Sequence, residues 1–193
     1  MEPVYPALLG SSWSELGDPV KNLHAAHTSA RGRFRVIRGE GALARFIGAL
    51  CGMPRAGEDV EVTLAVKRTD GAEEWSRSFA GKPLLTRQWV QRGLLVEALG
   101  LVLCLFRLKV EEGVLVFDQV GASIGGRKFA LPIPSFLAPR IEGRAKRDGE
   151  RVHVHVRISA PLAGLLVSYE GRVATYEGPV AAAASALEPR TAP

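Results

Sequence analysis

The sequence predicts a mainly β fold at the margin of α+β, built as a curved antiparallel meander of about eight to ten strands. From residue 58 to residue 176, apolar and polar side chains alternate with period two. Short Gly-containing turns separate these segments at even spacing, and only the N-terminal part has a helical period. We expect the sheet to curl into an open barrel or half-barrel. A helix-grip fold of the START type ranks second, because its long C-terminal helix is missing here.

Residues 5–26 predict two short helices. Apolar side chains recur there at gaps of three or four, with an interruption at Gly17-Asp18-Pro19. Asp18 is expected to cap the second helix, with Pro19 in its first turn, where proline costs least.

A strand and a third helix follow. Residues 33–36 alternate polar and apolar, which predicts a strand that ends at the Gly39-Glu40-Gly41 turn. The next segment, 42–50, predicts a helix that Gly52 and Pro54 terminate. Its apolar side chains share one face: Leu43, Phe46, Ile47 and Leu50.

The remaining strands are read from alternation and turn residues. A strand after Glu58 ends at Asp70-Gly71, a strong hairpin signal, and the next strand places Trp75, Arg77 and Phe79 on one face. Further strands are expected over 85–91, 94–99, 101–110, 114–120, 141–146, 152–159 and 165–176. Three prolines within residues 131–139 forbid continuous pairing, so this apolar stretch is expected outside the sheet as a plug or lid.

Length and composition favour one domain. With 193 residues, 47% of them hydrophobic, the chain can bury a core of its own. We expect that domain over residues 1–177, with a helical part at 5–52 and the sheet at 58–177. The Ala- and Pro-rich tail, 178–193, has no period and is predicted to be disordered.

Other features bear on compartment and partners. The longest apolar run, residues 101–106, is far below the ~20 residues of a spanning helix, and the N-terminus does not resemble a secretory signal, so we expect a cytoplasmic protein that is not transmembrane. Cys51 and Cys104 lie in apolar surroundings and are expected to be reduced and inert. The net charge of +5 reflects two arginine-rich groups, residues 31–38 and 140–151, which we interpret as solvated strand faces. We therefore do not expect nucleic acid as a partner.

No pattern of catalytic residues stands out, and neither a cofactor nor a metal is expected. His24 with His27, and His153 with His155, are short histidine spacings of low specificity for a metal. Acid–base chemistry would need an inward carboxylate in a desolvated pocket. The candidates on predicted strands are Glu74, Glu97, Asp118 and Glu170, with Arg77, Arg87 and Arg107 as opposing charges.

A ligand site is expected inside the curved sheet. Aliphatic strands of this kind can enclose an apolar cavity, and the proline-rich segment can cover its mouth. The residues expected to bind a ligand are Trp75, Arg77, Phe79, Arg87, Trp89, Arg107, Leu131 and Phe136.

Four motifs in the same order give a family resemblance. They are Gly57-Glu58-Asp59-Val60, Glu74-Trp75-x-Arg77-x-Phe79-x-Gly81, Leu131-Pro132-x-Pro134-x-x-Leu137-x-Pro139 and Pro161-Leu162-x-Gly164-Leu165-Leu166-Val167-x-Tyr169-x-Gly171. With these motifs the chain resembles the bacterial DUF4166 family from about Tyr5 to Val173. It departs from that pattern at Glu97-Ala98-Leu99-Gly100, where Glu-Phe-Gly is more usual, and at Ala160, where His is frequent. If that histidine serves chemistry in relatives, this chain lacks it.

The resemblance implies a domain without established activity, found alone or attached to saccharopine-dehydrogenase-like domains. Three hypotheses remain open. The first is non-catalytic binding of a hydrophobic or lipid-like small molecule. The second is an interaction domain for a nucleotide-binding oxidoreductase. The third and weakest is an enzyme that uses an inward carboxylate.

Overall fold

The structure, a computed structural model, describes residues 3–25, 27–127 and 129–176. Eleven antiparallel strands form one sheet in the order β6-β5-β4-β3-β2-β1-β11-β10-β9-β7-β8, and β6 also pairs with β7. Because β7 contacts both β6 and β9, ten strands close into a barrel and β8 lies outside the ring. The predicted mainly β meander is confirmed. The barrel is closed, whereas an open barrel or half-barrel was expected.

The helices precede the sheet or interrupt its start. They are α1 (Val4–Leu9), the 3-10 helix η1 (Gly10–Glu15), α2 (Asp18–Leu23) and α3 (Ala42–Leu50). The strands are β1 (Ser29–Arg38), β2 (Gly57–Thr69), β3 (Ala72–Phe79), β4 (Lys82–Gln91), β5 (Leu94–Leu99), β6 (Val102–Glu111), β7 (Val114–Gly125), β8 (Ala130–Pro132), β9 (Arg140–Asp148), β10 (Arg151–Ala160) and β11 (Gly164–Thr175).

Two-residue turns fix much of this order. The pairs Asp70-Gly71, Ala80-Gly81, Arg92-Gly93 and Glu112-Gly113 each have two successive positive φ angles. That backbone matches the right-handed twist of the strands it joins, and glycine at the second position adopts it without steric cost. Each turn therefore returns the chain beside the strand it has just left, as a meander requires.

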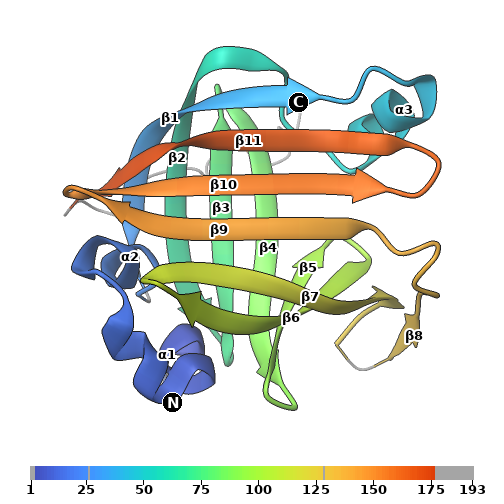
Figure 1. Cartoon of the computed structure of the whole chain (residues 1–193). Coiled ribbons are helices and arrows are strands. Elements are labelled where there is room, and N and C mark those ends of the chain that lie inside the picture. Colours follow the sequence, from blue (N-terminus) through green and yellow to red (C-terminus); the bar gives the residue numbers. More distant parts are fainter. Residues whose placement is uncertain (1–2, 26, 128, 177–193) are drawn as a thin grey trace, which may run out of the picture.

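The barrel is flattened into two layers that cross. In Figure 1, β9, β10 and β11 run across the view in front, and β2, β3 and β4 run nearly at right angles behind them. The core fills the space between these layers, and residues of α1 and α2 join it. The two helices lie near one end of the front strands, and α3 lies beyond the opposite end.

Two N-terminal details differ from expectation. Gly17 occupies the N-cap of α2 and makes no side-chain cap, whereas Asp18 lies in the first turn, 3.5 Å from Lys21. Pro19 does lie in the first turn. Asp18 does not cap α2 because the helix begins one residue earlier than expected, so that Asp18 is its first residue.

Helix α3 has the predicted bounds and an unexpected orientation. Its small residues, Ala44 and Gly48, are buried, and a Cβ at Gly48 would lie 1.8 Å from the Arg38 guanidinium. The helix thus rests on its narrow side. Its large apolar residues Leu43, Phe46 and Leu50, which are 45%, 66% and 77% exposed, point to solvent.

None of the helices in the described part of the chain has both the length and the apolar character of a membrane span. The predicted disorder of residues 178–193 concerns a segment outside the described residues.

Candidate functional site

A cavity of about 140 Å³ lies inside the barrel. Its wall is mostly aliphatic and aromatic, with side chains from strands of both layers and from α1 and α2. Polar groups gather on one side, where β3, β4 and β5 are neighbours. The cavity thus combines an apolar volume with a small set of hydrogen-bonding groups, the usual character of a small-molecule site.

The polar side of the cavity is formed by residues that pair across β3, β4 and β5. Glu73 on β3 is in register with Gln88 on β4, and Gln88 is in register with Glu97 on β5. Cross-strand partners share a face of the sheet, and Gln88 and Glu97 line the cavity. One row of the barrel interior is therefore polar across three strands.

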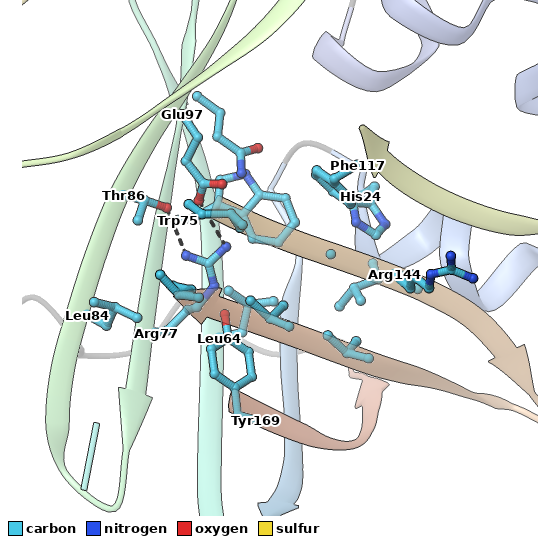
Figure 2. A pocket seen from close by; sticks show the side chains of 18 of the residues that line it. His24, Leu64, Trp75, Arg77, Leu84, Thr86, Glu97, Phe117, Arg144 and Tyr169 are labelled. Carbon is cyan, nitrogen blue, oxygen red and sulfur yellow. Dashed lines mark hydrogen bonds and ion pairs between the residues drawn. The ribbon is translucent and has the colours of Figure 1, made fainter. Parts of the chain in front are cut away.

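Arg77 is the charged centre of the cavity. Its Nη1 donates a hydrogen bond to the Thr86 hydroxyl at 2.8 Å, and its Nη2 lies 3.6 Å from Glu97 Oε1. The guanidinium carbon also lies 5.1 Å from the centre of the Trp75 ring, within the range of a cation–π contact. Figure 2 shows these groups converging on the guanidinium, with Tyr169 close by. A buried charge is tolerated when it is paired and hydrogen-bonded in this way.

Helix α1 closes the polar side. The backbone N–H of Val4 donates to Glu73 Oε1 at 3.1 Å, and the Tyr5 hydroxyl donates to Gln88 Oε1 at 2.8 Å. Burial raises the pKa of Tyr5 well above its usual value, and the Glu97 and Glu73 charges add to the rise. The phenol therefore stays protonated and serves as a donor.

His24, the C-cap residue of helix α2, is buried against aromatic rings. Its ring centroid lies 4.5 Å from that of Tyr5 and 5.5 Å from that of Trp75. Nδ1 lies 2.9 Å from the Val20 carbonyl oxygen, so this nitrogen carries the proton. Burial lowers the pKa of His24 to about 4, although the bond to Val20 opposes that shift. At neutral pH the imidazole is uncharged.

Glu73 is a fully buried carboxyl with an incomplete set of partners. Its Oε2 and the Trp75 indole nitrogen have no hydrogen-bond partner within normal geometry. Burial raises the pKa of Glu73, and the hydrogen bond from Val4 together with the nearby Trp75 N–H opposes the rise. The alternation along β3 that places Trp75, Arg77 and Phe79 inward also places Glu73 inward. The sequence therefore indicated that Glu73 is interior, although Glu73 is not among the candidate carboxylates.

The structure separates the predicted ligand residues into two groups. Trp75, Arg77 and Phe79 line the cavity. The other five lie elsewhere on the molecule: Arg87, Trp89, Arg107, Leu131 and Phe136.

The alternation of inward and outward residues along each strand, together with local packing, explains the positions of Arg87, Arg107 and Trp89. Arg87 and Arg107 are exposed on the outer surface, because Thr86 and Phe106 take the inward positions beside them. Trp89 also points outward and is buried by a separate cluster made by Ala72, Val96 and Leu103.

The proline-rich segment does not reach the cavity. Leu131 and Phe136 are 56% and 73% exposed, and neither lines the cavity wall. Apart from Leu131 and Pro132, which belong to β8, the segment stays outside the sheet as expected. It lines an external groove between β7 and β9 instead.

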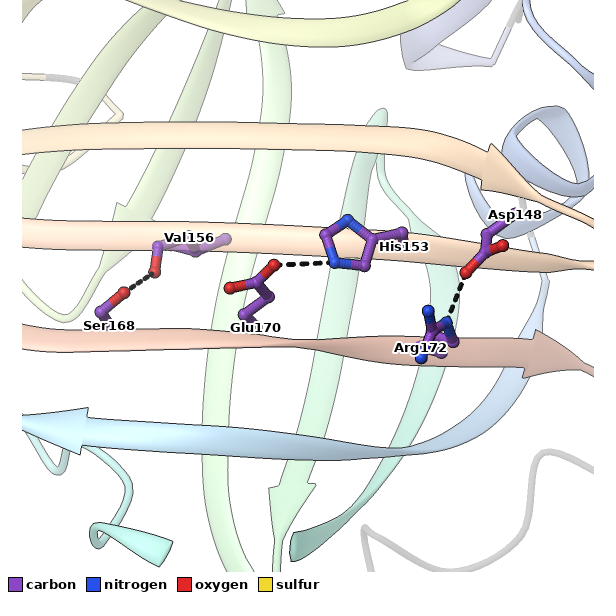
Figure 3. A network of polar contacts seen from close by, with 6 residues as sticks. All are labelled: Asp148, His153, Val156, Ser168, Glu170 and Arg172. Atoms are coloured by element: carbon purple, nitrogen blue, oxygen red, sulfur yellow. Dashed lines mark hydrogen bonds and ion pairs between the residues drawn. The ribbon is translucent and has the colours of Figure 1, made fainter. Parts of the chain in front are cut away.

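Of the four predicted inward carboxylates, Glu97 alone lies on the cavity wall. Asp118 is on the outer surface, 2.6 Å from Lys109, whose hydrogen bond and charge lower the pKa of that carboxyl. Glu170 accepts from His153 Nε2 at 2.9 Å on the outer face of β10 and β11, as Figure 3 shows. Glu74 is in register with the exposed Arg87, so the expectation of an inward position is wrong for it as well.

The histidine pairs do not converge. His24 is interior and His27 is exposed. His153 and His155 lie two residues apart on β10 and share its outer face, so the two pairs do not meet. Within the described residues no group of three or more metal-ligating side chains occurs. Burial raises the pKa of Cys104 to about 12, and neither Cys51 nor Cys104 is part of a disulfide.

The arginine-rich β1 face is balanced by acidic partners. Arg33 contacts Asp59 at 2.6 Å, Arg35 contacts Glu58 at 3.0 Å, and Arg172 contacts Asp148. Apart from Asp148, which lies on β9, these paired residues line a charged surface groove over β1, β2, β10 and β11. The arrangement fits the interpretation as a solvated strand face.

Comparisons with known proteins bear on the family. No curated protein matches the chain significantly. The crystal structure of Rv2717c from M. tuberculosis superposes with a TM-score of 0.48 and 14% identity, covering 84% of this chain and 99% of that one. The family described as "Domain of unknown function (DUF4166)" matches residues 16–173, most of the chain. The protein therefore belongs to the DUF4166 family, as its motifs indicated.

Proposed function

We propose that the barrel binds a small hydrophobic molecule and does not transform it. The apolar part of the ligand occupies the cavity, and one polar group meets the Arg77–Glu97 pair. The observation that carries this proposal is the cavity itself, an apolar volume of about 140 Å³ with convergent polar groups inside a packed barrel. Unfilled interior space costs stability, because its lining atoms lose their contacts. A bound molecule would restore them.

The volume limits the ligand. An engineered apolar cavity of ~150 Å³ in another protein binds benzene, whereas sites for larger ligands span roughly 300–1,000 Å³. The cavity of about 140 Å³ therefore matches a molecule with about six carbons. A longer, lipid-like molecule must extend beyond it.

The charges limit the ligand further. The Arg77 guanidinium is already matched by the Glu97 carboxylate at 3.6 Å. An anionic ligand would leave Glu97 unpaired, which is costly in a desolvated site. A neutral hydroxyl or carbonyl can join the network through Arg77 or Glu97 without that cost.

Calorimetric titration with benzyl alcohol and toluene tests the proposal. Both should bind, with benzyl alcohol tighter because its hydroxyl reaches the polar side. Leu84→Phe, which fills the cavity, should abolish binding, and Leu85→Phe is the matched control because its side chain is 45% exposed on the outer surface. The absence of binding to the wild-type protein, or unchanged binding to a folded Leu84→Phe variant, would refute it.

A second candidate function rests on the exposed face of α3. Its residues Leu43, Phe46 and Leu50 form an apolar stripe at positions i, i+3 and i+7, and Leu162 on the adjoining β10–β11 turn is 95% exposed. Contiguous exposed apolar residues commonly mark an interaction surface. This favours an accessory role beside a nucleotide-binding oxidoreductase, in line with the association that the family resemblance implies.

The experiment for this alternative is co-expression with a saccharopine-dehydrogenase-like domain, followed by size-exclusion chromatography. A complex that forms with the wild-type chain and is lost in Leu43→Ser/Phe46→Ser/Leu50→Ser supports the role. A Val90→Ser variant, on the exposed surface of β4, is the control. Independent elution of both proteins would contradict it.

A further inference from the structure

The barrel has one weakly paired seam, between β7 and β9. Only three register pairs join these strands, Leu115 with Ala145, Val116 with Arg144 and Phe117 with Gly143. Beyond Phe117, the two strands have no further register pairs with each other. A groove of about 790 Å³ occupies this region, bounded on its other side by the proline-rich segment.

The groove adjoins the cavity. Phe117, Ile141, Gly143 and Arg144 line both spaces, so a single layer of side chains separates them. Gly143 makes room for the Phe117 ring, because a Cβ there would lie 3.3 Å from it. Phe117 is only half-buried although it borders the interior cavity, which places its ring at the boundary between the two spaces.

A glutamine side chain replaces the missing ladder. Gln119 Nε2 donates to the Pro139 carbonyl oxygen at 2.8 Å, and Gln119 Oε1 accepts from the Ile141 backbone N–H at 2.6 Å. These two bonds tie β7 to the start of β9 where backbone pairing stops. A side chain can rotate away and break both at once, whereas a ladder opens only when the backbone moves.

We infer that the β7–β9 seam is the entrance to the barrel, and that the groove is the outer half of the ligand site. This inference rests on the proposed function. Rotation of Gln119 and Phe117 joins the cavity to the groove, and the combined site takes an elongated, uncharged amphiphile. Its polar end lies at Arg77 and Glu97, and its apolar chain passes Phe117 into the groove.

Calorimetry with the 1-alkanols from butanol to decanol tests the extended site. Affinity should rise about fourfold for each methylene, and the rise should continue beyond hexanol, whose chain already fills the cavity. Gly121→Phe places a ring in the groove, since a Cβ at Gly121 meets open space. It should lower the decanol-to-butanol affinity ratio at least tenfold. Gly126→Phe, also at an open position and outside the groove wall, should leave the ratio unchanged.

Hydrogen exchange supplies a second readout that needs no ligand. In Gln119→Ala the Ile141 amide loses its acceptor and should exchange at least tenfold faster, while the Val154 amide on β10 should not change. The same variant should release decanol several-fold faster.

The outcomes separate the two ideas. A rise in affinity that continues to decanol and disappears in Gly121→Phe supports the extended site. A rise that stops at hexanol, or equal decanol release from wild type and Gln119→Ala, overturns the inference and leaves the cavity proposal standing. Failure of every alkanol and of benzyl alcohol to bind overturns both.

Discussion

The guanidinium of Arg77 on β3 and the carboxylate of Glu97 on β5 meet 3.6 Å apart inside the barrel, with strand β4 between their own strands. Their side chains are 17% and 19% exposed, so water screens the pair only weakly. Removal of one partner should leave a poorly solvated charge, whereas removal of both leaves none.

Glu97→Gln should therefore lower the free energy of unfolding by about 2 kcal/mol, less than for a fully buried pair. The double variant Arg77→Met/Glu97→Leu should recover much of that loss. Urea unfolding of Arg77→Met, Glu97→Leu and the double variant measures the coupling. Additive losses would show that the pair contributes nothing.

His24 should make the protein less stable in mild acid. Its pKa is about 4 in the folded state against an ordinary value of 6.5, so between these pH values the unfolded chain binds one more proton. Stability then falls as the pH falls. We expect the free energy of unfolding to drop by about 2 kcal/mol more between pH 7 and pH 5 in wild type than in His24→Phe. Parallel pH profiles for the two proteins would contradict this.

Glu73 should have the opposite pH dependence. Burial raises its pKa, so the folded state holds the proton more tightly than the unfolded chain, and the cost of ionisation is present above the unfolded pKa. Glu73→Gln should therefore be more stable than wild type at pH 8, and this gain should disappear at pH 4. Chemical unfolding at both pH values measures the difference.

A companion variant isolates the hydrogen bond from Val4. Glu73→Leu removes the acceptor and leaves the buried Val4 N–H without a partner. It should be about 1–3 kcal/mol less stable than Glu73→Gln. Equal stability of the two variants would mean that water satisfies this amide.

The contact between β1 and β11 depends on glycine. A Cβ at Gly171 would lie 2.1 Å from the Arg33 carbonyl oxygen, closer than any non-bonded contact allows. Gly171→Ala should lower the free energy of unfolding by about 3 kcal/mol, since the strands must move apart. Gly126→Ala, at a position with open space, is the control and should change stability by less than about 0.5 kcal/mol. Thermal unfolding of both variants provides the test.

Local patterns in the sequence predicted most of the elements. Helix α3 and strand β5 have the bounds that periodicity indicated, and the Asp70-Gly71 turn lies where its composition placed it. These features depend on neighbours in the chain. Alternation also placed Trp75, Arg77 and Phe79 on the cavity wall, because strand parity survives folding unchanged.

The closure of the barrel and the burial of outward-facing side chains could not be predicted from local sequence patterns. The pairing of β7 with β9 depends on how far the whole sheet curls, and only three register pairs complete it. Trp89 has the outward parity of a solvent-facing residue, yet Ala72, Val96 and Leu103 bury it on the outer surface. The orientation of α3 could not be predicted from its apolar stripe either, because the small residues Ala44 and Gly48 form the side that packs on the barrel.

A continuous ring of strands also affects how copies of this protein behave when crowded. Every strand of the ring has its backbone donors and acceptors matched on both sides over at least part of its length, and only β8, which ends at Pro132, borders a single neighbour. Proline cannot donate to an incoming strand. Intermolecular strand addition, a common first step toward fibrils, therefore finds few templates on the described part of this molecule.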